Sequence, residues 1–198
     1  MLPHVRPSHR LASTYPIKGT RARRRDVVQD ELQKRELLAS EKDRAEHLMI
    51  VDLLRNDLGR DALPGGVSVP SLAYLESFPT IHHLTSQVMA EFRAGTTTTQ
   101  IFEALFPGGS ITGAPKLRAM EIIDDLECDA RGVYTGSILA LSPLGAVANI
   151  AIRTAEIVRG EVRFGVGGGI VSDSDPDTEW HETEVKAVAL TNALLGDR

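Results

Sequence analysis

The chain contains 198 residues, of which 42% are hydrophobic and 25% charged, a composition typical of a globular domain and not of a disordered chain. The net charge of −5 argues against a chain-wide attraction to nucleic acid, and the single cysteine, Cys128, excludes an intramolecular disulfide and a multi-cysteine zinc site. No apolar run approaches the roughly 20 residues of a membrane span, and the first residues lack the apolar core of a secretory signal, so we expect a cytoplasmic protein.

The first part of the chain predicts an irregular segment and one long helix. Residues 1–14 contain two prolines and no acidic residue, and they show no apolar periodicity. Residues 21–25 form a basic run that we interpret as solvated; the alternative, nucleic-acid binding, lacks interleaved aromatic residues. Over residues 30–58, apolar residues recur at three- and four-residue steps among charges, which indicates an amphipathic helix.

The later elements are shorter. We expect strands over residues 67–75 and 81–92, a helix over 97–105, and a glycine-rich loop over 106–116 that leads into another helix. Strands follow over 134–141, 146–158 and 161–166, with a tight hairpin at Arg159-Gly160, and a helix over 177–195 closes the chain. Because strands and helices do not alternate strictly, the pattern indicates an α+β fold, with an antiparallel sheet and flanking helices.

Lys18 is a candidate nucleophile. It follows Pro16-Ile17 and precedes Gly19. The proline makes the backbone before Lys18 stiff, and the glycine after it allows the backbone to approach a ligand closely. The competing interpretation is an ordinary solvated lysine near a turn.

Two predicted helices carry acidic pairs. Glu179 and Glu182 share one helix face with Lys186, and Asp43 and Glu46 are spaced i, i+3 on the earlier helix. Ordinary charge pairing would explain each pair alone. If the helices meet, their carboxylates suit Mg²⁺, which one or two carboxylates hold together with waters and an anionic ligand. Zinc fits less well because no closely spaced histidine and cysteine set is present.

Two glycine-rich segments and one arginine indicate an anionic ligand. Residues 108–116 bring backbone N–H groups to a predicted helix start, although the glycine spacing is not that of a P-loop. Residues 167–169 offer further amides, with a bulge or a turn as the alternative interpretation. Arg153 falls inside the predicted strand over 146–158, where burial would demand an anionic partner.

Five segments, in chain order, resemble the chorismate-utilising enzymes. They are PIKGT at 16–20, AEHLMIVDLLRND at 45–57, PGGSITGAPK with RAME at 107–121, IRT at 152–154, and GGGIV with DS at 167–174. The match runs from about residue 15 to the C-terminus. The lysine in PIKGT resembles the aminodeoxychorismate synthase component I branch, since anthranilate synthases usually carry alanine there.

The resemblance implies a site. It makes Lys18 the catalytic nucleophile. Its implied Mg²⁺ ligands are Glu46 and Glu182, with Glu179 and Asp43 close by. The residues that it implies for substrate binding are Gly19, Thr20, His83, Ser110, Thr112, Gly113, Ala114, Tyr134, Arg153, Gly167, Gly168 and Lys186.

The implied reaction replaces the 4-hydroxyl of chorismate by an amino group, on the route to 4-aminobenzoate and folate. Lys18 would add to ring carbon C2 as the hydroxyl leaves, and ammonia from a glutamine amidotransferase partner would then attack C4 and expel the lysine. Amination at C2, as in anthranilate synthases, is one alternative. An inactive chorismate-binding fragment that needs an N-terminal half is another.

The chain departs from the family pattern in two respects. Family members are much longer, so we divide the chain into residues 1–14, which do not match, and 15–198, a catalytic domain without its N-terminal half. The family also has a general-acid glutamate in a Ser-Pro-Glu motif before the lysine, yet no acidic residue precedes Asp26 here. The source of the proton for the leaving hydroxyl is therefore unassigned.

Overall fold

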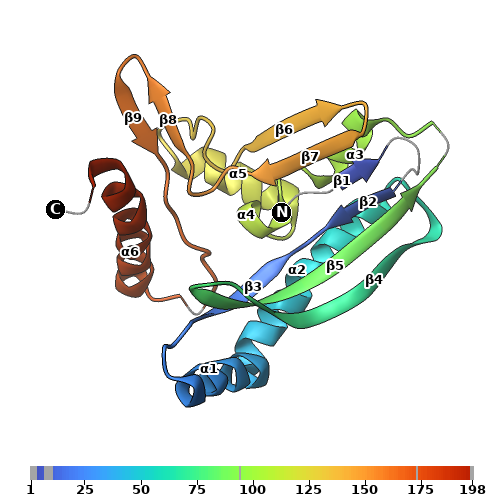
Figure 1. Cartoon of the computed structure of the whole chain (residues 1–198). Helices are drawn as coiled ribbons and strands as arrows, with labels where there is room; N and C mark the ends of the chain where they lie inside the picture. Colours follow the sequence, from blue (N-terminus) through green and yellow to red (C-terminus); the bar gives the residue numbers. More distant parts are fainter. Residues whose placement is uncertain (1–3, 7–10, 94, 173, 197–198) are drawn as a thin grey trace.

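The computed structural model describes residues 4–6, 11–93, 95–172 and 174–196, and its elements form a sheet with helices around it (Figure 1). The strands are β1 (His4–Arg6), β2 (Leu11–Thr14), β3 (Ile17–Ala22), β4 (Ala62–Ser77), β5 (Ile81–Phe92), β6 (Ser137–Ser142), β7 (Gly145–Ile150), β8 (Ala155–Val158) and β9 (Glu161–Phe164). The helices are α1 (Val27–Ala39), α2 (Glu41–Gly59), α3 (Thr98–Leu105), α4 (Gly109–Thr112), α5 (Lys116–Leu126) and α6 (Pro176–Leu195).

Seven strands make one antiparallel sheet. Their order is β3-β5-β2-β1-β7-β6, with β4 paired to β5, while β8 and β9 form a separate two-stranded sheet. Successive elements are often neighbours, and no parallel pair occurs in the part of the chain that the structure describes. The predicted α+β class with an antiparallel sheet and flanking helices is confirmed.

The prediction of an irregular segment over residues 1–14 is wrong where it falls on described residues. β1 and β2 are strands, and β2 pairs with β5 from Leu11 opposite Glu91 to Thr14 opposite Val88. In β2, Ala12 and Thr14 are buried and alternate with half-buried Leu11 and Ser13. An alternation of only four residues is too short to predict a strand from the sequence. Residues 1–3 and 7–10 of this prediction lie outside the described part.

The single helix predicted over residues 30–58 is two helices that meet at Ser40. The Ser40 N–H donates to the carbonyl of Leu37 and ends α1, and its hydroxyl accepts from the N–H of Asp43 and begins α2. A serine with extended backbone at this point satisfies groups that a continuous helix would have paired internally. Because the apolar periodicity continues across Ser40, the sequence pattern predicted one helix.

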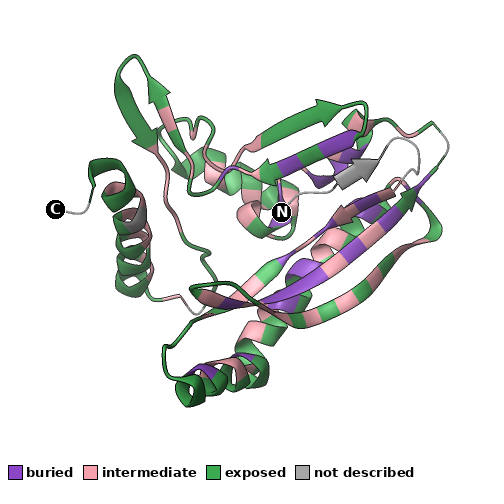
Figure 2. Ribbon diagram, viewed as in Figure 1, coloured by how far each residue is buried: buried purple, intermediate pink, exposed green. Residues whose placement is uncertain are grey.

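The core lies between α2, α3 and the sheet. Alternate residues of β5 are buried and meet Val51 and Leu58 of α2 and Leu105 of α3 (Figure 2). The later elements are far less covered: none of the described side chains of α5 or α6 is buried, and Leu126, Leu141 and Trp180 are exposed. Apolar burial therefore stabilises the first half of the fold most strongly.

Three local predictions have clear outcomes. Thr97 and Gln100 form the capping box of α3, as the threonines predicted, and Arg159 and Gly160 both have positive φ in the tight hairpin between β8 and β9. The strand predicted over 146–158 is divided into β7 and β8. Within the described residues, no helix has both the length and the apolarity of a membrane span.

Candidate active site

Lys18 lies on β3 beside a glycine bulge. Lys18 pairs with Leu84 of β5 and Thr20 pairs with His83, which leaves Gly19 as the extra residue, with φ of 77°. A Cβ atom on Gly19 would lie 2.9 Å from Cδ1 of Leu37. Glycine thus allows β3 to approach the helices closely. Thr20 Oγ1 is 2.9 Å from His83 Nδ1, so these two predicted substrate residues are in contact.

Both predicted acids of α2 face β3. Lys18 Nζ lies 2.8 Å from Glu46 Oε2, and Arg21 Nη2 lies 3.0 Å from Asp43 Oδ2. The Lys18–Glu46 pair is partly exposed, with 43% and 36% of the two side chains accessible. Because Asp43 already neutralises Arg21, its main contribution here is to hold β3 against α2.

Glu182 of α6 lies within the electrostatic range of Lys18. Its carboxylate accepts from Lys186 Nζ at 2.5 Å, and that hydrogen bond, strengthened by the charges of Lys186, Lys18 and Lys42, keeps the pKa of Glu182 below its ordinary value. Lys18 therefore acts electrostatically on Glu182 while it contacts Glu46. Lys18 is thus the link between the two helices, through its contact with Glu46 and its field at Glu182, while a direct meeting of the two acidic pairs stays a prediction.

Lys42 was missed at the level of sequence, and Ser174 was noted only as part of the DS motif, without a role. Lys42 precedes Glu46 by one helical turn, and this i, i+4 spacing was a signal that could have identified it. Ser174 Oγ donates to Glu179 Oε1 at 2.6 Å and fixes that carboxylate beside Gly168, where a Cβ would be 3.0 Å from Glu179 Oε2.

The glycine segment lies between Tyr134 and Lys186. A Cβ on Gly167 would be 2.7 Å from the Tyr134 hydroxyl, and Lys186 Nζ donates to the carbonyl of Gly167 at 3.0 Å. Burial raises the pKa of Tyr134, which keeps its hydroxyl protonated as a hydrogen-bond donor. A phenol, an ammonium and backbone amides thus border one surface, a combination suited to a carboxylate ligand.

Arg153 differs from the prediction. It is exposed and lies in the break between β7 and β8, with φ of 50°, and so it is not inside a strand. The Ile152 N–H donates to the carbonyl of Ile150 in a tight local turn, and the apolar residues around it had suggested a continuous strand. An exposed arginine needs no buried anionic partner, so that part of the sequence argument does not apply.

The predicted loop residues are at and after α4. Ser110 and Thr112 are in this short helix, and Gly113 and Ala114 follow it. Thr112 Oγ1 donates to the carbonyl of Gly108 at 3.2 Å. This segment packs between α2 and β7, since a Cβ on Gly109 would contact Leu53 and one on Gly108 would contact Ile150.

The carboxylates of Glu46 and Glu182 are of the type that binds magnesium, and in this structure each of them forms an ion pair with a lysine. Among the described residues, no three histidine, cysteine, aspartate or glutamate side chains form a group that could hold a metal ion. Glu46 and Glu182 nevertheless offer one partly exposed carboxylate from each helix. Two carboxylates are sufficient for Mg²⁺, which retains waters in its coordination shell.

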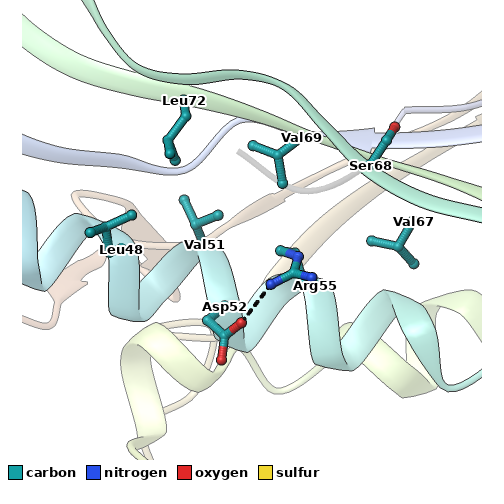
Figure 3. Close-up of a pocket in the computed structure, with 8 residues that line it drawn as sticks. All are labelled: Leu48, Val51, Asp52, Arg55, Val67, Ser68, Val69 and Leu72. Atoms are coloured by element: carbon teal, nitrogen blue, oxygen red, sulfur yellow. Dashed lines mark hydrogen bonds and ion pairs between the residues drawn. The ribbon is translucent and has the colours of Figure 1, made fainter. Parts of the chain in front are cut away.

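A separate groove lies between α2 and β4 (Figure 3). Leu48 and Val51 form part of its apolar floor, and Asp52 pairs with Arg55 at 2.9 Å along its edge. None of the predicted site residues is among the described residues that line it, so the groove is distinct from the Lys18 site.

Comparison with known proteins identifies the family. The profile of the family described as "chorismate binding enzyme" matches residues 3–192. The chain belongs to this family. The resemblance in the motifs is thereby confirmed, and the match begins before the domain boundary predicted at residue 15.

Relatives of this chain include two kinds of synthase. Aminodeoxychorismate synthase component 1 of Salmonella typhimurium is 51% identical over 182 residues, which are 91% of this chain and 40% of that protein. Anthranilate synthase component 1 of Aquifex aeolicus is 44% identical over 96% of this chain and 39% of its own length. The chain therefore spans about 40% of the length of these relatives.

Solved structures agree with the fold of the chorismate-binding family. Anthranilate synthase component I from Streptococcus pneumoniae superimposes with a TM-score of 0.84 at 37% identity, covering 96% of this chain and 41% of that one. The menaquinone-specific isochorismate synthase MenF from Escherichia coli gives a TM-score of 0.83 at 25% identity, covering 96% and 43%.

Proposed function

We propose that this chain carries the nucleophile and the substrate-binding residues for amination of chorismate at C4, giving 4-amino-4-deoxychorismate. The observation that carries this proposal is the position of Lys18, 2.8 Å from Glu46 and within electrostatic reach of Glu182. A lysine paired with a carboxylate of α2 and felt by a carboxylate of α6, in a chain that also carries a surface suited to anions, supports attack on a bound dicarboxylate ring.

Each group has a separate role in this proposal. Tyr134, Lys186 and the Gly167–Gly168 amides bind a carboxylate of the ring, while His83 and Thr20 border it. Lys18 attacks C2 as a neutral amine, so it must lose its proton before the C–N bond forms. The C4–O bond breaks as the C–N bond forms, and the hydroxyl takes up one proton and leaves as water. Glu46 is the nearest carboxylate to that proton. Mg²⁺, held by Glu46 and Glu182, would neutralise substrate carboxylate charge and compete with Lys18 for Glu46.

Ammonia would come from a glutamine amidotransferase partner, since the related proteins are named component 1. The second candidate function is amination at C2, which the anthranilate synthase relatives favour. Lys18 favours C4, because a covalent lysine at C2 leaves C4 as the carbon that ammonia attacks.

Incubation of the chain with chorismate, Mg²⁺ and ammonium chloride tests the proposal directly. We expect chromatography and mass spectrometry to find 4-amino-4-deoxychorismate, and omission of Mg²⁺ to remove it. A product aminated at C2 would assign the chain to the second function. Calorimetric binding of chorismate without turnover, with activity restored by an added N-terminal half of a relative, would identify a binding fragment instead.

A further inference from the structure

We infer that Arg131 is a positioning residue that holds Tyr134 at the substrate surface. This inference rests on the proposed function for its consequence, and on the structure for its geometry. Among the described residues assigned above to the reaction, Arg131 contacts Tyr134, directly at the ring and through Thr135 at the backbone.

Arg131 is itself fixed by a carboxylate. Its Nε and Nη2 atoms donate to the two oxygens of Glu127 at 2.7 and 2.5 Å, a bidentate pair that also raises the pKa of Arg131. The Arg131 side chain is only 26% accessible. A planar cation held by two hydrogen bonds has little rotational freedom.

From this position Arg131 reaches Tyr134 in two ways. Its Cζ atom lies 5.9 Å from the centroid of the Tyr134 ring, within the range of a cation–π contact. Its Nη1 atom donates at 3.1 Å to Thr135 Oγ1, which in turn donates to the carbonyl of Tyr134 at 2.6 Å. Both the ring and the backbone of Tyr134 are therefore connected to Arg131.

The backbone at Thr135 needs such support. Thr135 has φ of 62°, a left-handed conformation that a β-branched residue adopts at an energetic cost. The turn is further held by Glu156, which accepts from the N–H of Val133 at 2.8 Å, and by the N–H of Thr135, which donates to the carbonyl of Ala151. A strained backbone persists only where neighbouring contacts hold it. Here the contacts from Arg131, Glu156 and Ala151 hold the turn that carries the Tyr134 side chain.

Gly165 also constrains the ring. A Cβ on Gly165 would lie 2.2 Å from Cγ of Tyr134, so the ring lies flat on the backbone after β9. Arg131 and Gly165 thus define the position of the ring from two directions. Its hydroxyl then reaches the backbone of Gly167. Movement of the ring would displace a hydrogen-bond donor from the carboxylate surface.

The first test needs no substrate. Nitration of tyrosines by tetranitromethane, located by peptide mass spectrometry, should be several-fold faster at Tyr134 in Arg131→Ala than in the unchanged chain, with Tyr74 as the internal reference. Gly165→Ala should have the same effect. The matched controls are Arg163→Ala, which removes an exposed arginine, and Gly169→Ala, whose Cβ would meet nothing within 4 Å. Unchanged nitration in Arg131→Ala would overturn the inference.

The second test measures chorismate affinity in a double-mutant cycle. Arg131→Ala and Tyr134→Phe should each raise the Kd about tenfold, the size of one charge-assisted hydrogen bond. In the Tyr134→Phe background, Arg131→Ala should then change the Kd by less than about twofold. Additive effects would contradict positioning through Tyr134. If the unchanged chain binds no chorismate, the proposed function fails, and nitration alone decides whether Arg131 holds the ring.

Discussion

Lys18 and Glu46 form a partly exposed ion pair, so a ligand can reach the amine without unfolding of the surrounding strand and helix. The positive charge of Lys18 and its role as a nucleophile can be tested separately. Arginine can keep the ion pair with Glu46, but it remains protonated at neutral pH and is not a nucleophile.

We therefore predict that Lys18→Arg removes formation of the aminated product while chorismate binding changes little. Product formation measured by liquid chromatography and chorismate affinity measured by calorimetry would show this separation. Arg44→Lys, on the exposed side of α2, is a control of the same size. Retained turnover in Lys18→Arg would exclude Lys18 as the nucleophile.

Asp30 predicts a pH dependence of stability. Hydrogen bonds from the Arg24 N–H, His82 and Arg23 hold the pKa of Asp30 well below its ordinary value. A carboxyl with a depressed folded-state pKa stabilises the fold above its unfolded pKa of about 4 and loses that contribution as the pH falls. Urea unfolding should show lower stability at pH 3 than at pH 6, with a smaller difference in Asp30→Asn. An equal difference in Asp30→Asn and in Asp52→Asn, an exposed control, would contradict this assignment.

At the scale of single elements, β3 and α2 together determine the site. The glycine bulge shifts the register of β3, and Ser40 begins α2 six residues before Glu46. A shift in either element would separate Lys18 from Glu46. Local backbone features thus control the distance between two charged groups.

Gly19→Ala should destabilise the chain by about 1–3 kcal/mol, because it combines a positive φ with a Cβ 2.9 Å from Leu37. Gly65→Ala is the matched control: its φ is also positive, but a Cβ there meets nothing within 4 Å. Urea unfolding should rank Gly19→Ala as the more costly change. Equal losses would mean that contact with α1 and α2 does not constrain the bulge.

The sequence was most informative where one residue type carries a local signal. The capping box at Thr97, the hairpin at Arg159-Gly160 and the motif around Lys18 could each be identified from neighbouring residues alone. β2 could not, because four residues of mixed polarity become a strand only by pairing with β5. Arg131 gave no signal either, since its role depends on Glu127, Tyr134 and Thr135 meeting in the folded chain.

At the scale of the whole molecule, the two halves are buried unequally. The core formed by α2, α3 and β5 is densely covered, whereas α5, β6 and α6 expose many large apolar side chains (Figure 2). Specific polar contacts between the halves therefore matter. One of these joins α5 to α2: Lys116 Nζ lies 3.0 Å from Oδ2 of Asp57, whose side chain is only 8% accessible.

Lys116→Met should destabilise the chain by about 1–3 kcal/mol, because it leaves the buried carboxylate of Asp57 without its cation. Arg118→Met, which breaks the exposed pair with Glu121 on the same helix, should cost less than about 1 kcal/mol. Adding Asp57→Asn should recover part of the loss in Lys116→Met. Equal costs for the two single variants in urea unfolding would show that this contact does not connect the halves.

The most direct measurement of the central claim is the mass of the chain after incubation with chorismate and Mg²⁺ without ammonia. We expect an adduct of chorismate less one water, located on the peptide that contains Lys18 and lost when ammonium is added. Formation of 4-amino-4-deoxychorismate with no adduct on Lys18, or an adduct that persists in Lys18→Arg, would contradict it.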